Sequence, residues 1–230
     1  MRASSSGSGS PGSVRDAVAF HAAFGVLALA GLALPAPALG WRLLALVVIY
    51  NVAFFLVGRW RMHREWTRLW AFLVPLSAFQ VIPDAVLVGV IGSLDFPDTG
   101  GPRLGPIPLA MAGMWTIPLW VALFAADRQR AGDRVRILVA GLFTGLILVG
   151  AEATLWAIPI WQAVGVTTVA HVALYVVLPE VLLGSVAYAA YLSTRDGSRG
   201  RQVAAAALVS LVYAGALVTS YGIIERGLFP

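Results

Sequence analysis

The sequence predicts an all-α integral membrane protein, a bundle of seven transmembrane helices. Of its 230 residues, 59% are hydrophobic and only 12% are charged, whereas a soluble domain is about 45–50% apolar. The apolar residues gather in seven runs of about 20, the length that a helix needs to cross the hydrocarbon core. Helix is also the only backbone besides a closed barrel that pairs its own polar groups inside lipid.

The seven runs define the expected elements in order. We expect one membrane domain over residues 15–226, preceded by a flexible Gly/Ser-rich tail over residues 1–14. The first basic residues, the first apolar run and "LPAPALG" also fit a secretory signal, although the run is long for a signal core. The expected spans are 17–38, 42–58, 67–93, 107–126, 136–158, 166–193 and 203–224.

The arginines orient these spans. The chain has 16 basic residues and all are arginine. Thirteen fall at the amino terminus and in the second, fourth and sixth connections, and only Arg42, Arg103 and Arg226 fall on the other side. By the positive-inside rule this predicts a multi-pass protein of the cell membrane with a cytoplasmic amino terminus and an external carboxyl terminus. The basic pI of about 10.2 is then explained by topology and by anionic membrane lipids, and no nucleic-acid partner is expected.

Three acidic residues, Asp84, Glu152 and Glu180, fall inside predicted spans. A charged group at the bilayer centre costs about 2.5–3.5 kcal/mol or more, so such groups face the bundle interior and commonly mark function. The direction of each span places all three in its outer or middle part, and we expect them to converge on one cavity. The alternative is that they only form hydrogen bonds between helices.

Two of these acids follow a proline, in "QVIPDAVL" and "VVLPEVLL". A proline inside a helix frees the carbonyl four residues earlier and bends the helix. We expect Pro83 and Pro179 to bend the third and sixth spans beside a polar pocket, where the neighbouring acid supplies a donor to the freed carbonyl. The two copies fit either an inverted repeat of three helices or chance.

Helical spacing selects the neighbours of these acids. Gln80 lies four residues before Asp84, and Trp156 lies four residues after Glu152, so each pair shares a helix face. His171 is nine residues before Glu180, half a turn out of phase in an unbroken helix, and is expected to lie outside the site. The other aromatic residues expected deep in the membrane beside the acids, as substrate contacts, are Phe79, Trp115 and Tyr175.

The connection over residues 93–108, "SLDFPDTGGPRLGPIP", contains four prolines and three glycines and cannot be a helix. One interpretation is a lid that carries Asp98 and Arg103 over the cavity. The other is an ordinary surface connection with an Asp–Arg pair.

The residues that are missing exclude several classes of protein. The sequence has no cysteine and no lysine, and only three scattered histidines. It therefore lacks the ligands of a thiolate or histidine metal site, a lysine for a retinal Schiff base, and the aspartate clusters that hold magnesium diphosphate. We expect no metal and no cofactor.

The segment "GPRLGPIPLAMAGMWTIPLW", residues 101–120, together with acids buried in a seven-span chain of this length, resembles two related families. They are the lycopene cyclase domain proteins and the small seven-helix transmembrane terpene cyclases. In the lycopene cyclase pattern glutamates follow a Pro-Leu step, whereas Ala110 and Met111 follow Pro108-Leu109 here. If the resemblance holds, the acids must be supplied from elsewhere in the chain.

The leading hypothesis is a membrane-embedded cyclase or isomerase of a lipophilic isoprenoid. Glu152 or Asp84 would donate the initiating proton, Glu180 would stabilise charge or accept the final proton, and aromatic rings would shield the cation. A transporter with bent helices, which requires a polar route to both membrane faces, and a structural membrane subunit are the alternatives. The sequence leaves the substrate and the oligomeric state open.

Overall fold

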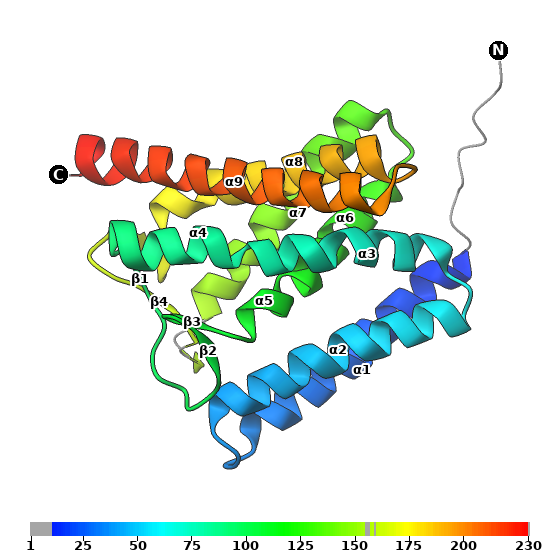
Figure 1. Ribbon diagram of the computed structural model, residues 1–230, viewed down its shortest axis with the longest axis horizontal. Coiled ribbons are helices and arrows are strands. Elements are labelled where there is room, and N and C mark those ends of the chain that lie inside the picture. The colour runs from blue at the N-terminus through cyan, green and yellow to red at the C-terminus, as the bar shows by residue number, and fades with distance from the viewer. Residues whose placement is uncertain (1–10, 155–156, 159, 230) are drawn as a thin grey trace.

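The computed structural model describes residues 11–154, 157–158 and 160–229, and most of them are helical. The long helices are joined by short turns and by three two-stranded sheets (Figure 1). The helices are α1 (Pro11–Ala33), α2 (Leu39–Trp60), α3 (Arg64–Phe79), α4 (Val81–Val86), α5 (Met111–Met114), α6 (Thr116–Asp127), α7 (Asp133–Thr154), α8 (Leu174–Thr194) and α9 (Arg199–Ile223). The strands are β1 (Leu94–Asp95), β2 (Arg103–Leu104), β3 (Ile107–Pro108), β4 (Gln162–Ala163), β5 (Thr168–Val169) and β6 (Val172–Ala173). A π-helical turn, Leu87–Ile91, continues α4, and a second, Ile224–Leu228, continues α9.

Six helical segments in the described part of the chain are long and apolar enough to cross a membrane. They are α1, α2, α3 with α4 and its π turn, α7, α8, and α9 with its π turn. Between the third and fourth of them, α5 and α6 form a shorter apolar segment, Met111–Asp127. The protein is therefore a helical multi-pass membrane protein. Large apolar side chains such as Leu29 and Leu178, 70% and 72% exposed, point outward where lipid would cover them.

One end of the bundle carries the arginine-rich turns, and we call it the arginine end. Figure 1 shows the turns at 61–63, 128–132 and 195–198 at this end. Asp16 of α1 accepts hydrogen bonds from Arg61 Nε at 2.8 Å and pairs with His63 Nε2 at 2.9 Å. Arg128, just after α6, donates to Glu65 of α3 at 3.1 Å. These contacts join α1, the α2–α3 turn and the α6–α7 turn.

The opposite end, the strand end, holds all six short strands. β1 pairs antiparallel with β4, so the connection after α4 is joined to the connection after α7. β2 pairs with β3 and β5 pairs with β6, each as a small hairpin. Gly40 N–H donates to the Thr99 carbonyl at 2.7 Å, which attaches the α1–α2 turn to the same end.

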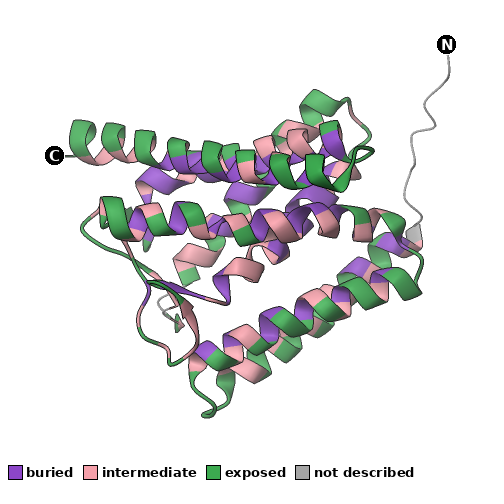
Figure 2. Cartoon of the chain, in the orientation of Figure 1, coloured by how far each residue is buried: buried purple, intermediate pink, exposed green. Residues whose placement is uncertain are grey.

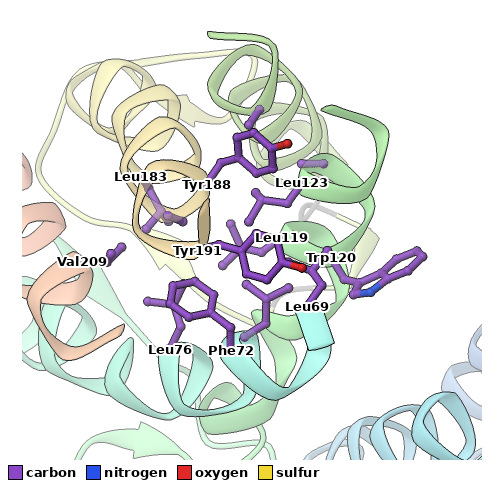
Figure 3. Packing of buried hydrophobic residues seen from close by; sticks show 14 of the residues in the cluster. Leu69, Phe72, Leu76, Leu119, Trp120, Leu123, Leu183, Tyr188, Tyr191 and Val209 are labelled. Atoms are coloured by element: carbon purple, nitrogen blue, oxygen red, sulfur yellow. The ribbon is translucent and has the colours of Figure 1, made fainter. Parts of the chain in front are cut away.

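The core lies between α3, α6, α8 and α9. Figure 2 shows buried residues along the faces that these helices turn toward one another and exposed residues on their outer faces. Figure 3 shows how Phe72 of α3, Leu119 and Leu123 of α6, and Tyr188 and Tyr191 of α8 fill the space between them. This core occupies the half of the bundle nearer the arginine end.

Small residues bring α7 and α8 into close contact. Gly141 and Gly145 of α7, spaced as G-x-x-x-G, both lie against Val181 of α8. Gly184 of α8 lies against the Thr144 side chain and the Ala140 backbone of α7. A side chain larger than hydrogen at Gly184 would separate the two helices.

The structure corrects several helix boundaries. The tail is shorter than expected: residues 1–10 lie outside the described residues, and residues 11–14 already belong to α1, where Ser13 is buried. Residues 107–108, expected in the fourth span, form β3 instead. Residues 168–173, expected at the start of the sixth span, form the β5–β6 hairpin, and α8 begins only at Leu174.

The two Pro-acid sites differ in structure. The helix of the third span is interrupted at Gln80, three residues before Pro83, where α3 ends and α4 begins. Pro179, in contrast, lies inside a single assigned helix, α8. The carbonyl that it frees, that of Tyr175, accepts a hydrogen bond from Ser220 Oγ of α9 at 2.6 Å. The expectation that the neighbouring acid pairs with this carbonyl is therefore wrong.

Candidate functional site

A cavity of about 650 Å³ lies in the half of the bundle nearer the strand end. This volume is within the range of about 300–1,000 Å³ usual for small-molecule sites. Its walls come from α4, α5, α6, α7, α8 and α9, and segments of the strand end also line it. The site is therefore assembled from helices far apart in sequence.

The three buried acids all line this cavity, from three different helices. Asp84 comes from α4, Glu152 from the last turn of α7, and Glu180 from the first half of α8. Asp84 and Glu180 are only 4% and 3% exposed. The three acids, which are far apart in the sequence, thus lie around one cavity.

The carboxyl groups have few partners within the described residues. Oδ2 of Asp84 and Oε2 of Glu180 are buried and accept no hydrogen bond. Glu152 Oε2 accepts one weak bond, from the Ala173 N–H at 3.3 Å. The Trp115 indole lies close to the Asp84 carboxyl group, but its Nε1 makes no well-formed hydrogen bond. Because a buried charge is costly unless it is paired, such a site suits neutral, protonated carboxyl groups.

The rest of the wall is mainly apolar and aromatic. None of the described lining residues is an arginine or lysine that could neutralise the acids. The larger apolar and aromatic members of the wall are Leu87, Leu94, Phe96, Met111, Met114, Trp115, Ile117, Pro118, Val121, Ile147, Leu148, Trp161, Tyr175, Val176 and Tyr213. Aromatic faces stabilise cations, so an acid next to such walls can protonate a hydrocarbon and hold the resulting charge.

The strand end covers the cavity. Ser93 and Phe96 of the first connection and Gln162 and His171 of the second all reach the lining. Ser93 Oγ and Tyr175 Oη are hydrogen-bonded at 2.8 Å, which joins the first connection to α8. Residues of two connections, and not of the first alone, therefore reach the cavity wall.

Two of the expected substrate contacts lie in the wall, and two others from the third span do not. Trp115 and Tyr175 line the cavity. Gln80 is fully buried, yet its side chain is absent from the lining and neither of its amide atoms has a partner. Phe79 packs partly buried against the core. Spacing of i, i+4 puts Gln80 near Asp84 along the helix but does not bring it to the cavity.

The two charged residues of the expected lid have structural contacts instead. Arg103 donates hydrogen bonds to the carbonyls of Phe96, Pro97 and Pro106 and so holds its own connection in shape. Asp98 is exposed and accepts the Gly100 N–H at 2.9 Å in a tight turn. Neither lines the cavity. Trp156, the expected partner of Glu152, lies outside the described residues.

His171 lines the cavity, contrary to expectation. The expected position of His171 holds only if residues 166–193 form one unbroken helix. Residues 168–173 form a hairpin instead, so the helical phase does not apply to them. His171 itself has φ of 69°, a left-handed conformation no helix contains. The β-branched run "VTTV" after Gly165 is the signal that indicates strand rather than helix here.

Tyr213 was also not expected in the site. It is 4% exposed, it lines the cavity from α9, and it carries a hydroxyl group into the region of the acids. Nothing in the sequence around it, "SLVYAGAL", separates it from an ordinary packing residue. Within the described residues no three His, Asp or Glu side chains are grouped closely enough to hold a metal ion.

Comparison with known proteins gives one match. Residues 81–224 match the family model described as Domain of unknown function (DUF6989). The chain belongs to this family. No curated protein and no solved structure matches it.

The DUF6989 region begins at the first residue of α4 and ends one residue after α9. Every residue of the cavity wall lies between Asp84 and Tyr213 and therefore inside this region. Helices α1, α2 and α3 lie outside the match. The candidate site therefore lies entirely within the matched region.

Proposed function

We propose that this DUF6989 protein is a membrane-embedded cyclase or isomerase of a lipophilic isoprenoid, acting by proton transfer from a buried carboxylic acid. One observation carries the proposal. Three carboxyl groups from three helices line a single cavity whose other walls are largely apolar and aromatic, with no described cation to pair them.

The cavity supports an isoprenoid as substrate by its size and its lining. A volume of about 650 Å³ is large enough for a folded hydrocarbon chain. Branched and aromatic side chains such as Ile117, Ile147 and Trp161 offer it apolar contact. Polar side chains are a minority of the lining, and the three acids are among them.

The proposed chemistry conserves the formula of the substrate. The O–H bond of a protonated Glu152 or Asp84 breaks as a C–H bond forms on one alkene carbon, leaving a carbocation on the other. Attack by a second alkene of the same chain closes a ring, and loss of a proton from the neighbouring carbon to Glu180 restores a double bond. Trp115 and Tyr175 shield the cation from water. No oxidant or reductant is consumed.

The resemblance to terpene cyclases agrees with this position of the site. Met111, one of the two residues that replace the glutamates of the lycopene cyclase pattern, lines the cavity. Glutamates at positions 110 and 111 would therefore lie at or beside the wall of the same cavity. In this chain Asp84, Glu152 and Glu180 supply the acid from other walls.

Transport is favoured less, because the cavity has no described lining residue in the arginine-end turns. Between the cavity and that end lie fully buried apolar residues, among them Leu73, Leu119 and Leu123. A carrier would have to open this core to reach the second membrane face. A purely structural subunit does not require a cavity of this size lined with acids.

The proposal includes a topology in which Met111–Asp127 is the seventh crossing. The arginine end then faces the cytoplasm, and the strand end and the carboxyl terminus face outward. Each arginine-rich turn is separated from the next by two crossings, which supports an odd number of spans. The cavity would open toward the outer leaflet.

The test compares lipid extracts of cells that make the wild-type protein with extracts of cells that make Asp84→Asn, Glu152→Gln or Glu180→Gln. Each amide side chain has nearly the shape of the acid, but it cannot act as a general acid or a general base. We expect a protein-dependent isoprenoid product to fall by roughly 10²–10⁴-fold in at least the donor variant, the usual contribution of general acid–base catalysis.

The matched control is Asp133→Asn, which removes an acid from the surface at the arginine end, where the side chain is 67% exposed. Its extract should equal that of the wild type. Undiminished product from all three cavity variants would end the proposal. A wild-type extract that equals that of cells without the protein would do the same.

A further inference from the structure

Polar groups continue from the cavity into the α7–α8 interface, where apolar packing would be expected. Thr144 of α7 is fully buried and its hydroxyl group has no partner. It lies against Gly184 of α8, one helical turn beyond Glu180. Glu180 itself has a buried, unpartnered Oε2. An unpaired buried polar group is destabilising, and valine would fill the space of Thr144 without leaving a hydroxyl group unpaired.

The row of polar groups continues one further turn along α8. Tyr188 is fully buried, and its hydroxyl group donates to Asp127 Oδ1 at 2.8 Å. Asp127 lies 3.9 Å from Arg136 Nη1, and the two side chains are 29% and 24% exposed. The row therefore begins at the cavity and ends in solvent-accessible groups at the arginine end.

The spacing along α8 is regular. Glu180, Gly184 and Tyr188 occupy positions i, i+4 and i+8 and share one face. Each step advances ~6 Å along the helix, and Thr144 is at the level of the middle position. Polar groups too far apart for a direct hydrogen bond can be joined by a bridging water. Bridging waters would also satisfy the two unpartnered oxygens.

We infer that Thr144, Tyr188 and Asp127 form a proton path between Glu180 and the arginine end of the bundle. The charged and titratable groups facing it are Asp127 of α6, Arg136 of α7 and, at the cavity, Glu152 of α7 and Tyr213 of α9. Under the proposed function, on which the purpose of the path rests, each cycle moves one proton from the donor acid to Glu180. Before the next cycle Glu180 must release a proton and the donor acid must regain one. The path returns the proton of Glu180 to water without opening the cavity that shelters the carbocation.

The experiment follows hydrogen–deuterium exchange of the Glu180 carboxyl group by infrared spectroscopy, on the whole protein in lipid nanodiscs transferred to D₂O. The C=O stretching band of Glu180 is the band that Glu180→Gln removes. We expect Thr144→Val and Tyr188→Phe each to slow the shift of this band by roughly a hundredfold, the lower end of what a positioned proton-transfer group contributes. Thr144→Ser, which keeps the hydroxyl group, should exchange at the wild-type rate.

Tyr191→Phe is the matched control, because Tyr191 is a buried tyrosine one turn further along α8. Wild-type exchange in both Thr144→Val and Tyr188→Phe would overturn the path, and so would equal slowing in the control. If one of these two variants does not fold, the exchange rate of the other variant tests the path. The measurement is made at a pH at which the Glu180 C=O band is present, because only the protonated carboxyl group has this band and a proton to exchange. The measurement uses no substrate, so its outcome is independent of whether the protein is a cyclase.

Discussion

Ser220 completes the hydrogen bonding of the helix that Pro179 interrupts. Proline has no N–H, so the carbonyl of Tyr175 lacks its intrahelical donor. Ser220 Oγ supplies the donor at 2.6 Å from the neighbouring helix. Residues 175 and 180 both line the cavity, and this bond ties their helical turn to α9.

Replacing Ser220 by alanine should therefore lower the free energy of unfolding by about 1–3 kcal/mol, the cost of a buried carbonyl without a partner. Thermal unfolding of the purified protein in detergent measures the loss. In a Pro179→Ala background the loss should be much smaller, because alanine restores the intrahelical N–H. An equal loss in both backgrounds would show that Ser220 acts by other means.

At the residue scale, the acids could be predicted from the sequence and their neighbours mostly could not. A carboxylate inside an apolar span is costly wherever it lies, so Asp84, Glu152 and Glu180 stand out by charge alone. Gln80 and Arg103 are polar as well, but what they contact depends on the local backbone. His171 was misassigned because its backbone is a hairpin and not a helix.

The contact between α7 and α8 depends on glycine. A Cβ atom at Gly184 would lie 2.6 Å from the Ala140 carbonyl oxygen and collide with the Thr144 side chain. Alanine there forces the helices apart, and overpacking of this kind costs about 1–3 kcal/mol. We expect Gly184→Ala to lower the midpoint of thermal unfolding.

The matched control for Gly184 is Gly150 of α7, where an added Cβ meets nothing within 4 Å. Gly150→Ala should leave the midpoint unchanged or raise it, because alanine favours helix over glycine. Equal midpoints for the two variants would contradict the close packing of α7 on α8.

At the element scale, the long apolar runs predict where helices occur, but they do not predict where each helix begins and ends. Each of the seven expected spans overlaps a helical segment of the structure. Residues 107–108 and 168–173 are apolar enough to continue a span, yet they form strands in two local hairpins. Pairing between connections far apart in sequence, such as β1 with β4, leaves no periodicity that a single segment could reveal.

At the scale of the whole molecule, the topology is testable because the sequence has no cysteine. Single cysteines at Leu104 of the strand end and Arg130 of the arginine end would both be exposed. In intact cells a membrane-impermeant maleimide should label Leu104→Cys, and should label Arg130→Cys only after the membrane is permeabilised. Labelling of both from one side would mean that Met111–Asp127 does not cross the membrane.

The central claim is that the acid-lined cavity binds an isoprenoid, and the lipid that co-purifies with the protein tests it most directly. Mass spectrometry should find an isoprenoid enriched with the wild-type protein. The isoprenoid should be absent from the Ala151→Trp variant, because the tryptophan side chain would fill the cavity from α7. The same mixture of bulk phospholipids on both proteins, with no isoprenoid on either, would contradict the account.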